Sequence, residues 1–217
     1  MKLNEITSNE ITAPALTPAQ VEWLEDMKIT KYSVDAEGFV NVGGSVDISH
    51  KNMTSIPVKF GRVGGNFYCN YNNISSFKGA PKVGKKIDCR ENTQGFFQGA
   101  PKEIRGDFYC NYKTLTSLQG APREVGGDFY CYNNSLTSLQ GGPGVVGGSY
   151  QCQSNNLTSL QGAPKEVGGD FDCYNNNLSS LQGAPRKVGG NFKCWDNKFT
   201  SEPDHSFIKI GGDFMWN

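Results

Sequence analysis

Residues Val167 to Pro185 have the sequence V-G-G-D-F-D-C-Y-N-N-N-L-S-S-L-Q-G-A-P, and residues Val125 to Pro143 have nearly the same sequence. All seven cysteines occupy one place in this unit, and they are separated by one gap of 20 residues and five gaps of 21. A fixed period of this size predicts a solenoid, in which each repeat is one coil stacked on the next. The cysteines are Cys69, Cys89, Cys110, Cys131, Cys152, Cys173 and Cys194.

Within one unit, the order of apolar residues predicts how the coil folds. In D-F-D-C-Y, apolar and polar residues alternate, which is the period of a strand with Phe171 and Cys173 facing inward. Asn176 comes three residues after the cysteine and is expected to turn the chain by bonding backbone groups. Leu178 and Leu181 then point inward again. We expect the proline-bearing remainder to be an irregular outer arc without a sheet ladder.

The pattern C-x-x-N-x-L-x-x-L, with an apolar residue two before the cysteine, resembles the leucine-rich repeat over about residues 42–216. The short, proline-bearing arc looks like the bacterial effector class of that family. The wording L-T-S-L-Q-G-A-P and V-G-G-D-F-x-C looks like uncharacterised repeat proteins of tailed bacteriophages. The resemblance implies a β-rich, right-handed solenoid with a parallel strand ladder and little helix. It brings no catalytic residues.

The ends of the array predict caps. Thr17, Pro18 and Gln20 suit the N-cap, first and third positions of a helix, and together predict a capping box. Terminal units of a solenoid must cover apolar surface, so a cap is the expected role, although a partner-binding helix around Trp23 is an alternative. The predicted organisation is a tail, a helix over about 18–28 and a hairpin in residues 1–41, the array in 42–201, and a C-terminal half-repeat in 202–217.

Two neighbouring units depart from the pattern. The unit of Cys89 follows the 20-residue gap and has Gln94 and Phe97 where leucine belongs. In the next unit, Lys113 replaces the turn asparagine. We expect local irregularity in these coils, either as tolerated drift or as a bent binding spot.

The cysteines are expected to be buried, reduced and structural. One cysteine per coil stacks the sulfurs at roughly the 4.8 Å strand spacing. Aligned neighbours on parallel strands rarely reach the dihedral angle that a disulfide needs. A ladder also does not converge four ligands on one zinc ion. Ile48 fills the cysteine place in an earlier unit and Trp216 fills it at the end, as suits an apolar position.

Composition restricts the possible partners and compartments. The chain has 21 Lys or Arg and 21 Asp or Glu, so it lacks the basic field that drives general nucleic-acid binding. No run of 18 apolar residues predicts a membrane span, and the N-terminus has no apolar signal core. We therefore expect the protein in the cytoplasm, and the phage resemblance implies the cytoplasm of a bacterial host.

The outward residues beside each cysteine form the candidate binding surface, which we expect to be the concave face of the strand ladder. Tyrosine and tryptophan dominate binding hot spots, and acids beside them favour a partner with basic patches. The plainer interpretation is that these are strand residues that tolerate solvent. The candidate residues are Tyr68, Tyr109, Tyr130, Tyr132, Tyr174, Trp195, Asp107, Asp128 and Asp170.

The sequence offers little for catalysis. His50 and His205 are the two histidines and lie far apart in the array, so a histidine-based triad or metal cluster lacks parts. The Gly-Gly-Asp segments are not phosphate loops, because no Lys-Ser/Thr follows them and no helix begins there. We expect neither an enzyme nor a cofactor or metal.

Two functional classes remain. The first is an interaction module that binds and modulates a protein; the phage resemblance implies a bacterial host protein, for example a defence component. The second is a self-assembling protein, in which two copies form a homodimer through the edge strand of the C-terminal coil. Nucleic acid and membrane are not expected partners.

Overall fold

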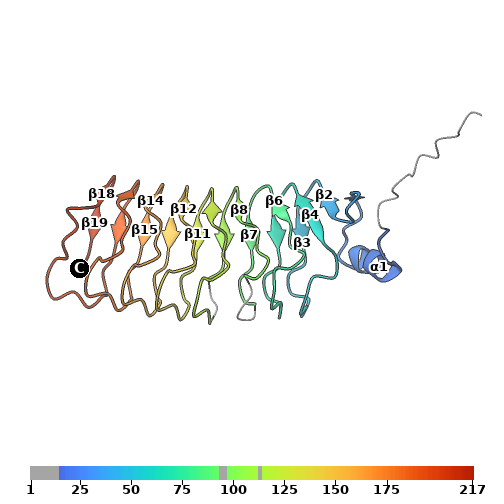
Figure 1. Cartoon of the computed structure of the whole chain (residues 1–217). Helices are drawn as coiled ribbons and strands as arrows, with labels where there is room; N and C mark the ends of the chain where they lie inside the picture. The colour runs from blue at the N-terminus through green and yellow to red at the C-terminus, as the bar shows by residue number, and fades with distance from the viewer. Residues whose placement is uncertain (1–14, 93–96, 112–113) are drawn as a thin grey trace, which may run out of the picture.

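The computed structural model describes residues 15–92, 97–111 and 114–217 and is a β-solenoid of parallel strands with one short helix at the N-terminal end (Figure 1). Most of the predicted tail, and the departures at Gln94 and Lys113, lie outside the described residues. In Figure 1 the coils stack one after another along the solenoid, with α1 at the N-terminal end.

One strand from each coil joins a nine-stranded parallel sheet, with the order β19-β17-β15-β13-β11-β9-β7-β5-β3. Equivalent residues pair directly, as Phe129 does with Phe108 and with Tyr150. The predicted parallel ladder is therefore confirmed. Its strands are β3 (Val46–Asp47), β5 (Phe67–Tyr68), β7 (Ile87–Asp88), β9 (Phe108–Tyr109), β11 (Phe129–Tyr130), β13 (Tyr150–Gln151), β15 (Phe171–Asp172), β17 (Phe192–Lys193) and β19 (Phe214–Met215).

The expectation that the proline-bearing arc makes no ladder is wrong. A second strand follows the proline in each coil, and six of these strands form a parallel sheet. Proline is compatible with it because the residue stands before the strand, as Pro164 does before Glu166, so its missing N–H is not needed. These strands are β8 (Glu103–Ile104), β10 (Glu124–Val125), β12 (Val145–Val146), β14 (Glu166–Val167), β16 (Lys187–Val188) and β18 (Lys209–Ile210).

At the N-terminal end, a four-stranded sheet in the order β1-β2-β4-β6 takes the place of this second ladder. Its first two strands form the antiparallel hairpin, as expected from the sequence. The next coils add β4 and β6 in parallel. The strands are β1 (Ser33–Val34), β2 (Val40–Val42), β4 (Phe60–Val63) and β6 (Lys82–Val83).

Helix α1 (Pro18–Asp26) confirms the predicted capping box and ends two residues earlier than expected. The Gln20 amide N–H donates to Thr17 Oγ1, and the Thr17 N–H donates to Gln20 Oε1 at 3.0 Å. Leu24 is fully buried, and Trp23 packs against the core near Phe60. The helix therefore covers apolar side chains of the first coils.

The core is a stack of equivalent apolar side chains along the solenoid axis. In the coil of Cys173, Phe171, Cys173 and Leu178 are all completely buried. All seven cysteines are buried free thiols, as expected. Burial raises the pKa of Cys131, Cys152 and Cys173 well above its usual value, so these thiols stay neutral.

The asparagine three residues after every cysteine except Cys110 ties neighbouring coils together. Asn155 Nδ2 donates to the carbonyl oxygens of Cys152 and Cys131, both at 3.1 Å, and its Oδ1 accepts the Leu136 N–H at 3.0 Å. The predicted bonds to the turn's own backbone are thus present, and bonds to the preceding coil add to them. The same amide pattern recurs at Asn176 and Asn197.

Candidate functional site

The nine predicted site residues all lie half-exposed on the outer side of the nine-stranded sheet, which we call the aromatic face. The acids stand directly before their strands, Tyr68, Tyr109 and Tyr130 are the second residues of β5, β9 and β11, and the others follow two residues later. The structure gathers them into a central group and a C-terminal group. The coil between these groups presents Ser149, Gln151 and Gln153 in the corresponding places.

The central group is built around two stacked tyrosines. The rings of Tyr109 and Tyr130 lie 4.4 Å apart at 13°, and Tyr132 meets Tyr130 edge-on at 6.3 Å. The Tyr130 hydroxyl donates to Asp128 Oδ2 at 2.7 Å, and the Tyr109 hydroxyl donates to Asp107 Oδ2 at 3.4 Å. Stacking and hydrogen bonds therefore hold these rings in fixed orientations.

These contacts also keep the tyrosines protonated. Burial raises the pKa of Tyr130, and the adjacent Asp128 carboxylate raises it further. Burial and the Asp107 carboxylate likewise raise the pKa of Tyr109. Both hydroxyls remain neutral donors at physiological pH.

Tyr68 joins the central group through Lys86. The Lys86 ammonium lies 5.1 Å from the Tyr68 ring centroid and 5.2 Å from that of Tyr109, which is the range of a cation–π contact. The Arg90 guanidinium lies 5.7 Å from the Tyr109 ring and donates two hydrogen bonds to Asp88. The central group thus has cations on its N-terminal side as well as acids.

The C-terminal group pairs Tyr174 with Trp195, whose rings stack at 4.4 Å and 10°. Beside them, Lys193 Nζ lies 2.7 Å from Asp170 and 3.1 Å from Asp172. Burial raises the pKa of Asp170, but hydrogen bonds from Lys193 and from the Asn191 N–H outweigh it, so the net pKa is lowered. The Asp170 carboxylate is therefore charged and already neutralised by a neighbouring ammonium.

The acids have a structural task that the sequence interpretation missed. Asp107 Oδ1 accepts the Asp128 N–H at 3.0 Å, and Asp170 Oδ1 accepts the Asn191 N–H at 2.8 Å. Ser149 Oγ does the same for the Asp170 N–H. The signal was present in the sequence, because this place is mostly filled by Asp, Asn or Ser, whose short side chains accept backbone hydrogen bonds. One oxygen of each of these carboxylates is therefore committed to the fold.

Several positions expected to face outward are buried. Asn111 is 0% exposed and Gln153 is 8% exposed, although both follow a cysteine directly. The strands are two residues long, so their alternation ends at the cysteine, and the next residue already enters the turn. Asp88 and Asp172 are also buried, under the partners Arg90 and Lys193.

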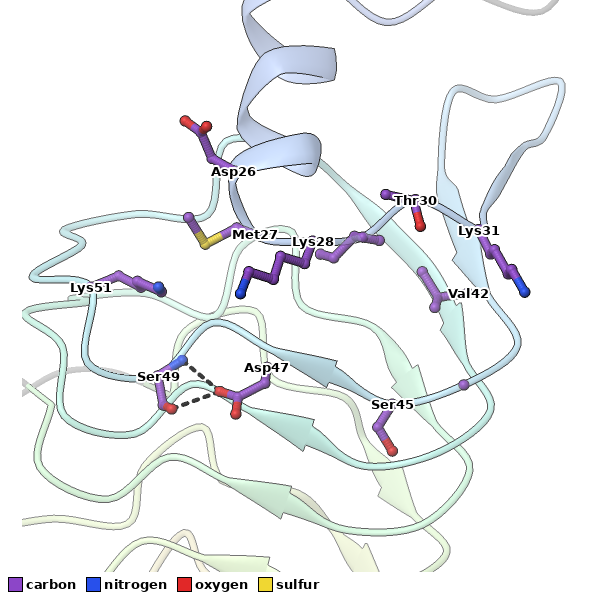
Figure 2. A pocket seen from close by; sticks show the side chains of 12 residues that line it. Asp26, Met27, Lys28, Thr30, Lys31, Val42, Ser45, Asp47, Ser49 and Lys51 are labelled. Carbon is purple, nitrogen blue, oxygen red and sulfur yellow. Dashed lines mark hydrogen bonds between the residues drawn. The ribbon is translucent and has the colours of Figure 1, made fainter.

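A separate cleft of about 590 Å³ lies between the end of α1 and β3, the edge strand of the nine-stranded sheet. Figure 2 shows Asp47 hydrogen-bonded to Ser49 within it, with Lys28 just after the helix and Lys51 on the loop that follows Ser49. Three lysines (Lys28, Lys31 and Lys51) and two aspartates (Asp26 and Asp47) line the cleft, so its mixed charge favours no one class of ligand. We assign it no function.

Other kinds of site are not evident in the described residues. Within residues 15–92, 97–111 and 114–217, no three His, Cys, Asp or Glu side chains are grouped so that they could hold a metal ion. Over the same part of the chain, no helix is long and apolar enough to cross a membrane.

No protein-family model, curated protein or solved structure matches the chain. The resemblances to leucine-rich repeats and to phage repeat proteins therefore stay predictions from the sequence wording.

Proposed function

We propose that this solenoid is a non-enzymatic protein-interaction module that binds its partner through the aromatic face. The observation that carries the proposal is the group of Tyr109, Tyr130 and Tyr132, half-exposed and held by stacking and by Asp128. Rings fixed in this way lose little conformational entropy on binding, which is the main cost of using large side chains in an interface.

The second group extends the proposed interface along the solenoid. Tyr174 and Trp195 follow Tyr132 by two and three coils, which corresponds to roughly 10–15 Å at the strand spacing. A partner that contacts both groups presents an elongated surface. Basic side chains of that partner would face Asp107 and Asp128, which lie beside tyrosines rather than in ion pairs.

The phage resemblance motivates the identity of the partner. We propose a phage-encoded protein that acts in the bacterial cytoplasm, where it binds and modulates a host protein such as a defence component. The proposed identity of the partner rests on the amino-acid sequence of the repeat alone.

The test is affinity capture from bacterial lysate with the wild type and the variant Tyr109→Ala/Tyr130→Ala/Tyr132→Ala. A matched control, Arg123→Ala/Lys165→Ala/Arg186→Ala, changes three exposed residues beside the six-stranded sheet. We expect a protein retained by the wild type and the control and lost from the tyrosine variant, with all three proteins equally folded by circular dichroism. If the tyrosine variant retains as much of that protein as the wild type does, the proposal is contradicted.

A second candidate function is self-assembly through the C-terminal coil. In the described chain, β18 and β19 are edge strands with a neighbour on one side. Ile210, Phe214 and Trp216 are half-exposed, and Phe207 is 51% exposed, whereas equivalent side chains in inner coils are buried. An edge with apolar side chains is a template for pairing with a second copy.

Light scattering of the full chain and of a chain ending before Phe207 tests this candidate. Assembly predicts a dimer for the full chain and a monomer for the shortened one. If both chains are monomers, the protein does not self-assemble. If both chains are dimers, the dimer contact lies outside the C-terminal coil.

A further inference from the structure

The second strand ladder is interrupted between two neighbouring coils. No strand pairing joins β6 of the four-stranded sheet to β8 of the six-stranded sheet. The interruption falls in the coil after the 20-residue gap, where irregularity was expected. Val83 comes two residues after Pro81, whereas Ile104 comes three after Pro101. The arc before β6 is thus one residue shorter than the arc before β8, whereas the register just after the two strands is the usual one, since the Gly106 N–H donates to the Lys85 carbonyl oxygen at 2.9 Å.

The interruption leaves backbone donors without a protein acceptor. In the next coil, the N–H groups of Glu124 and Gly126 donate backward to the carbonyl oxygens of Lys102 and Ile104, at 3.1 and 2.8 Å. The equivalent N–H groups belong to Glu103 and Arg105. In the described part of the chain they have no such bond, because β6 is not paired with β8.

A cleft of about 530 Å³ opens at this place, and its charged lining is mostly basic. We call it the β6–β8 cleft; Arg62, Lys82, Lys102 and Arg105 line it, with Glu103 as the one carboxylate. Arg62 and Lys82 are direct partners in adjacent strands, an arrangement of like charges that costs stability. Among the described residues, none of these four cations forms an ion pair.

The whole molecule is polarised toward this region. Residues 62–105 contain eight Lys or Arg and three Asp or Glu, a net charge of +5. Since the chain has 21 of each, the remaining residues carry a net charge of −5. The chain as a whole is neutral, but residues 62–105 form a basic segment, and the residues that line the cleft belong to that segment.

We propose that the β6–β8 cleft binds a phosphate-type oxyanion, either free or as the phosphate of a phosphomonoester. The guanidinium groups of Arg62 and Arg105 suit a tetrahedral oxyanion because they donate two parallel hydrogen bonds. Lys82 and Lys102 add charge, and the N–H groups of Glu103 and Arg105 add fixed donors. A bound dianion would relieve the repulsion between Arg62 and Lys82 and supply the missing acceptors.

The site is separate from the aromatic face, so it does not depend on the proposed protein-binding function. The neighbouring cleft on the other side of Arg62 and Lys82 contains Asp35 and Glu37. Asp35 is engaged by the N–H groups of Glu37 and Phe39 in the hairpin turn. Neither Asp35 nor Glu37 lines the β6–β8 cleft, and the Asp35 carboxylate is committed to the hairpin turn.

The chain offers a matched control for testing the site. Lys102 and Lys165 both follow a proline and precede a glutamate, but only Lys102 stands at the interruption. Arg105 occupies a place that is glycine in the following coils, so Arg105→Gly restores the usual residue. We compare Lys102→Gln and Arg105→Gly with Lys165→Gln and the wild type.

The measurement is a titration of the full chain with sodium phosphate at constant ionic strength, followed by ¹H–¹⁵N NMR. We expect saturable shifts of the Glu103 and Arg105 amide signals with phosphate and none with chloride. Lys102→Gln and Arg105→Gly should each weaken the association about tenfold, since hydrogen bonds to charged groups are the strong class. Lys165→Gln should leave it unchanged.

Parallel titrations with a phosphoserine peptide and with adenosine monophosphate distinguish the sources of the phosphate. Tighter binding of either one identifies its source, and equal binding of all three identifies the phosphate group itself as the ligand. Shifts that chloride reproduces, shifts confined to other coils, or equal weakening by Lys165→Gln and Lys102→Gln would overturn the proposal.

Discussion

Replacing Tyr150 by phenylalanine should stabilise the solenoid, although Tyr150 is completely buried. The residue stands in the place of Phe129 and Phe171, with which it pairs in the nine-stranded sheet. Its hydroxyl has no nitrogen or oxygen partner and lies beside the Cys131 thiol, a weak partner. A buried hydroxyl without a good acceptor costs about 1–3 kcal/mol. We expect a gain of about 1 kcal/mol, reduced by the void that the oxygen leaves.

Gly142 explains how the core accommodates this hydroxyl. Five other coils have alanine here, as at Ala121 and Ala163. A Cβ at Gly142 would lie 3.1 Å from Tyr150 Oη and 3.0 Å from Leu118 Cδ1. Gly142 does not have a positive φ, so alanine is compatible with the backbone. Gly142→Ala should therefore destabilise the wild type by about 1 kcal/mol through overpacking.

In the Tyr150→Phe background, the same Gly142→Ala substitution should cost less than in the wild type, because the contact with the hydroxyl is gone and only those with Leu118 Cδ1 and the Leu139 carbonyl oxygen, both at 3.0 Å, remain. The double-mutant cycle should give a coupling of about 0.3–1 kcal/mol. Guanidinium denaturation followed by circular dichroism measures all four proteins. A coupling below about 0.3 kcal/mol would refute the assignment of Gly142 as the space for the hydroxyl.

Three further outcomes follow from the same contacts. Asn155→Ala should destabilise by about 3 kcal/mol, because it leaves backbone groups of two coils unpaired, whereas Asn156→Ala at an exposed site should change little in the same denaturation assay. Lys193→Met should destabilise the protein at pH 7, because it removes the ammonium that pairs with the Asp170 carboxylate. The folded state lowers the pKa of Asp170, so this pair contributes stability above 3.8, the ordinary pKa of the group, and loses it as the carboxylate protonates. The difference in stability between the variant and the wild type should therefore shrink as the pH falls below 3.8. A difference that grows in acid would contradict this sign. The seven thiols should react with Ellman's reagent only after unfolding, and fast labelling of the native protein would contradict their burial.

The period and the apolar spine were predictable because they repeat. A side chain such as Cys173 or Leu178 is buried by the equivalent residues of adjacent coils, so one unit predicts the others. The second ladder was missed because its strands, such as Glu166–Val167, are two residues long and carry no alternation to detect. A nearby proline excludes only its own N–H from a ladder and not the strand that follows it.

The candidate site was predictable in position but not in chemistry. The outward direction of Tyr109 and Tyr130, the second residues of β9 and β11, follows from the strand period. The stacking of Tyr109 on Tyr130 and the commitment of Asp107 to the next coil depend on contacts across coils, 21 residues apart, which one unit does not display. The shorter arc before Val83 is visible in the sequence, but the interruption between β6 and β8 is seen only in the strand pairing.

Site-specific photo-crosslinking tests the binding face most directly. A photoreactive phenylalanine analogue at Tyr132 samples the aromatic face, and the same analogue at Val145, which is 55% exposed in the six-stranded sheet, samples a different side of the coil. If the aromatic face binds the partner, irradiation in bacterial cells joins one protein to position 132 and not to position 145. Crosslinking to the same protein from position 145 alone would contradict the account.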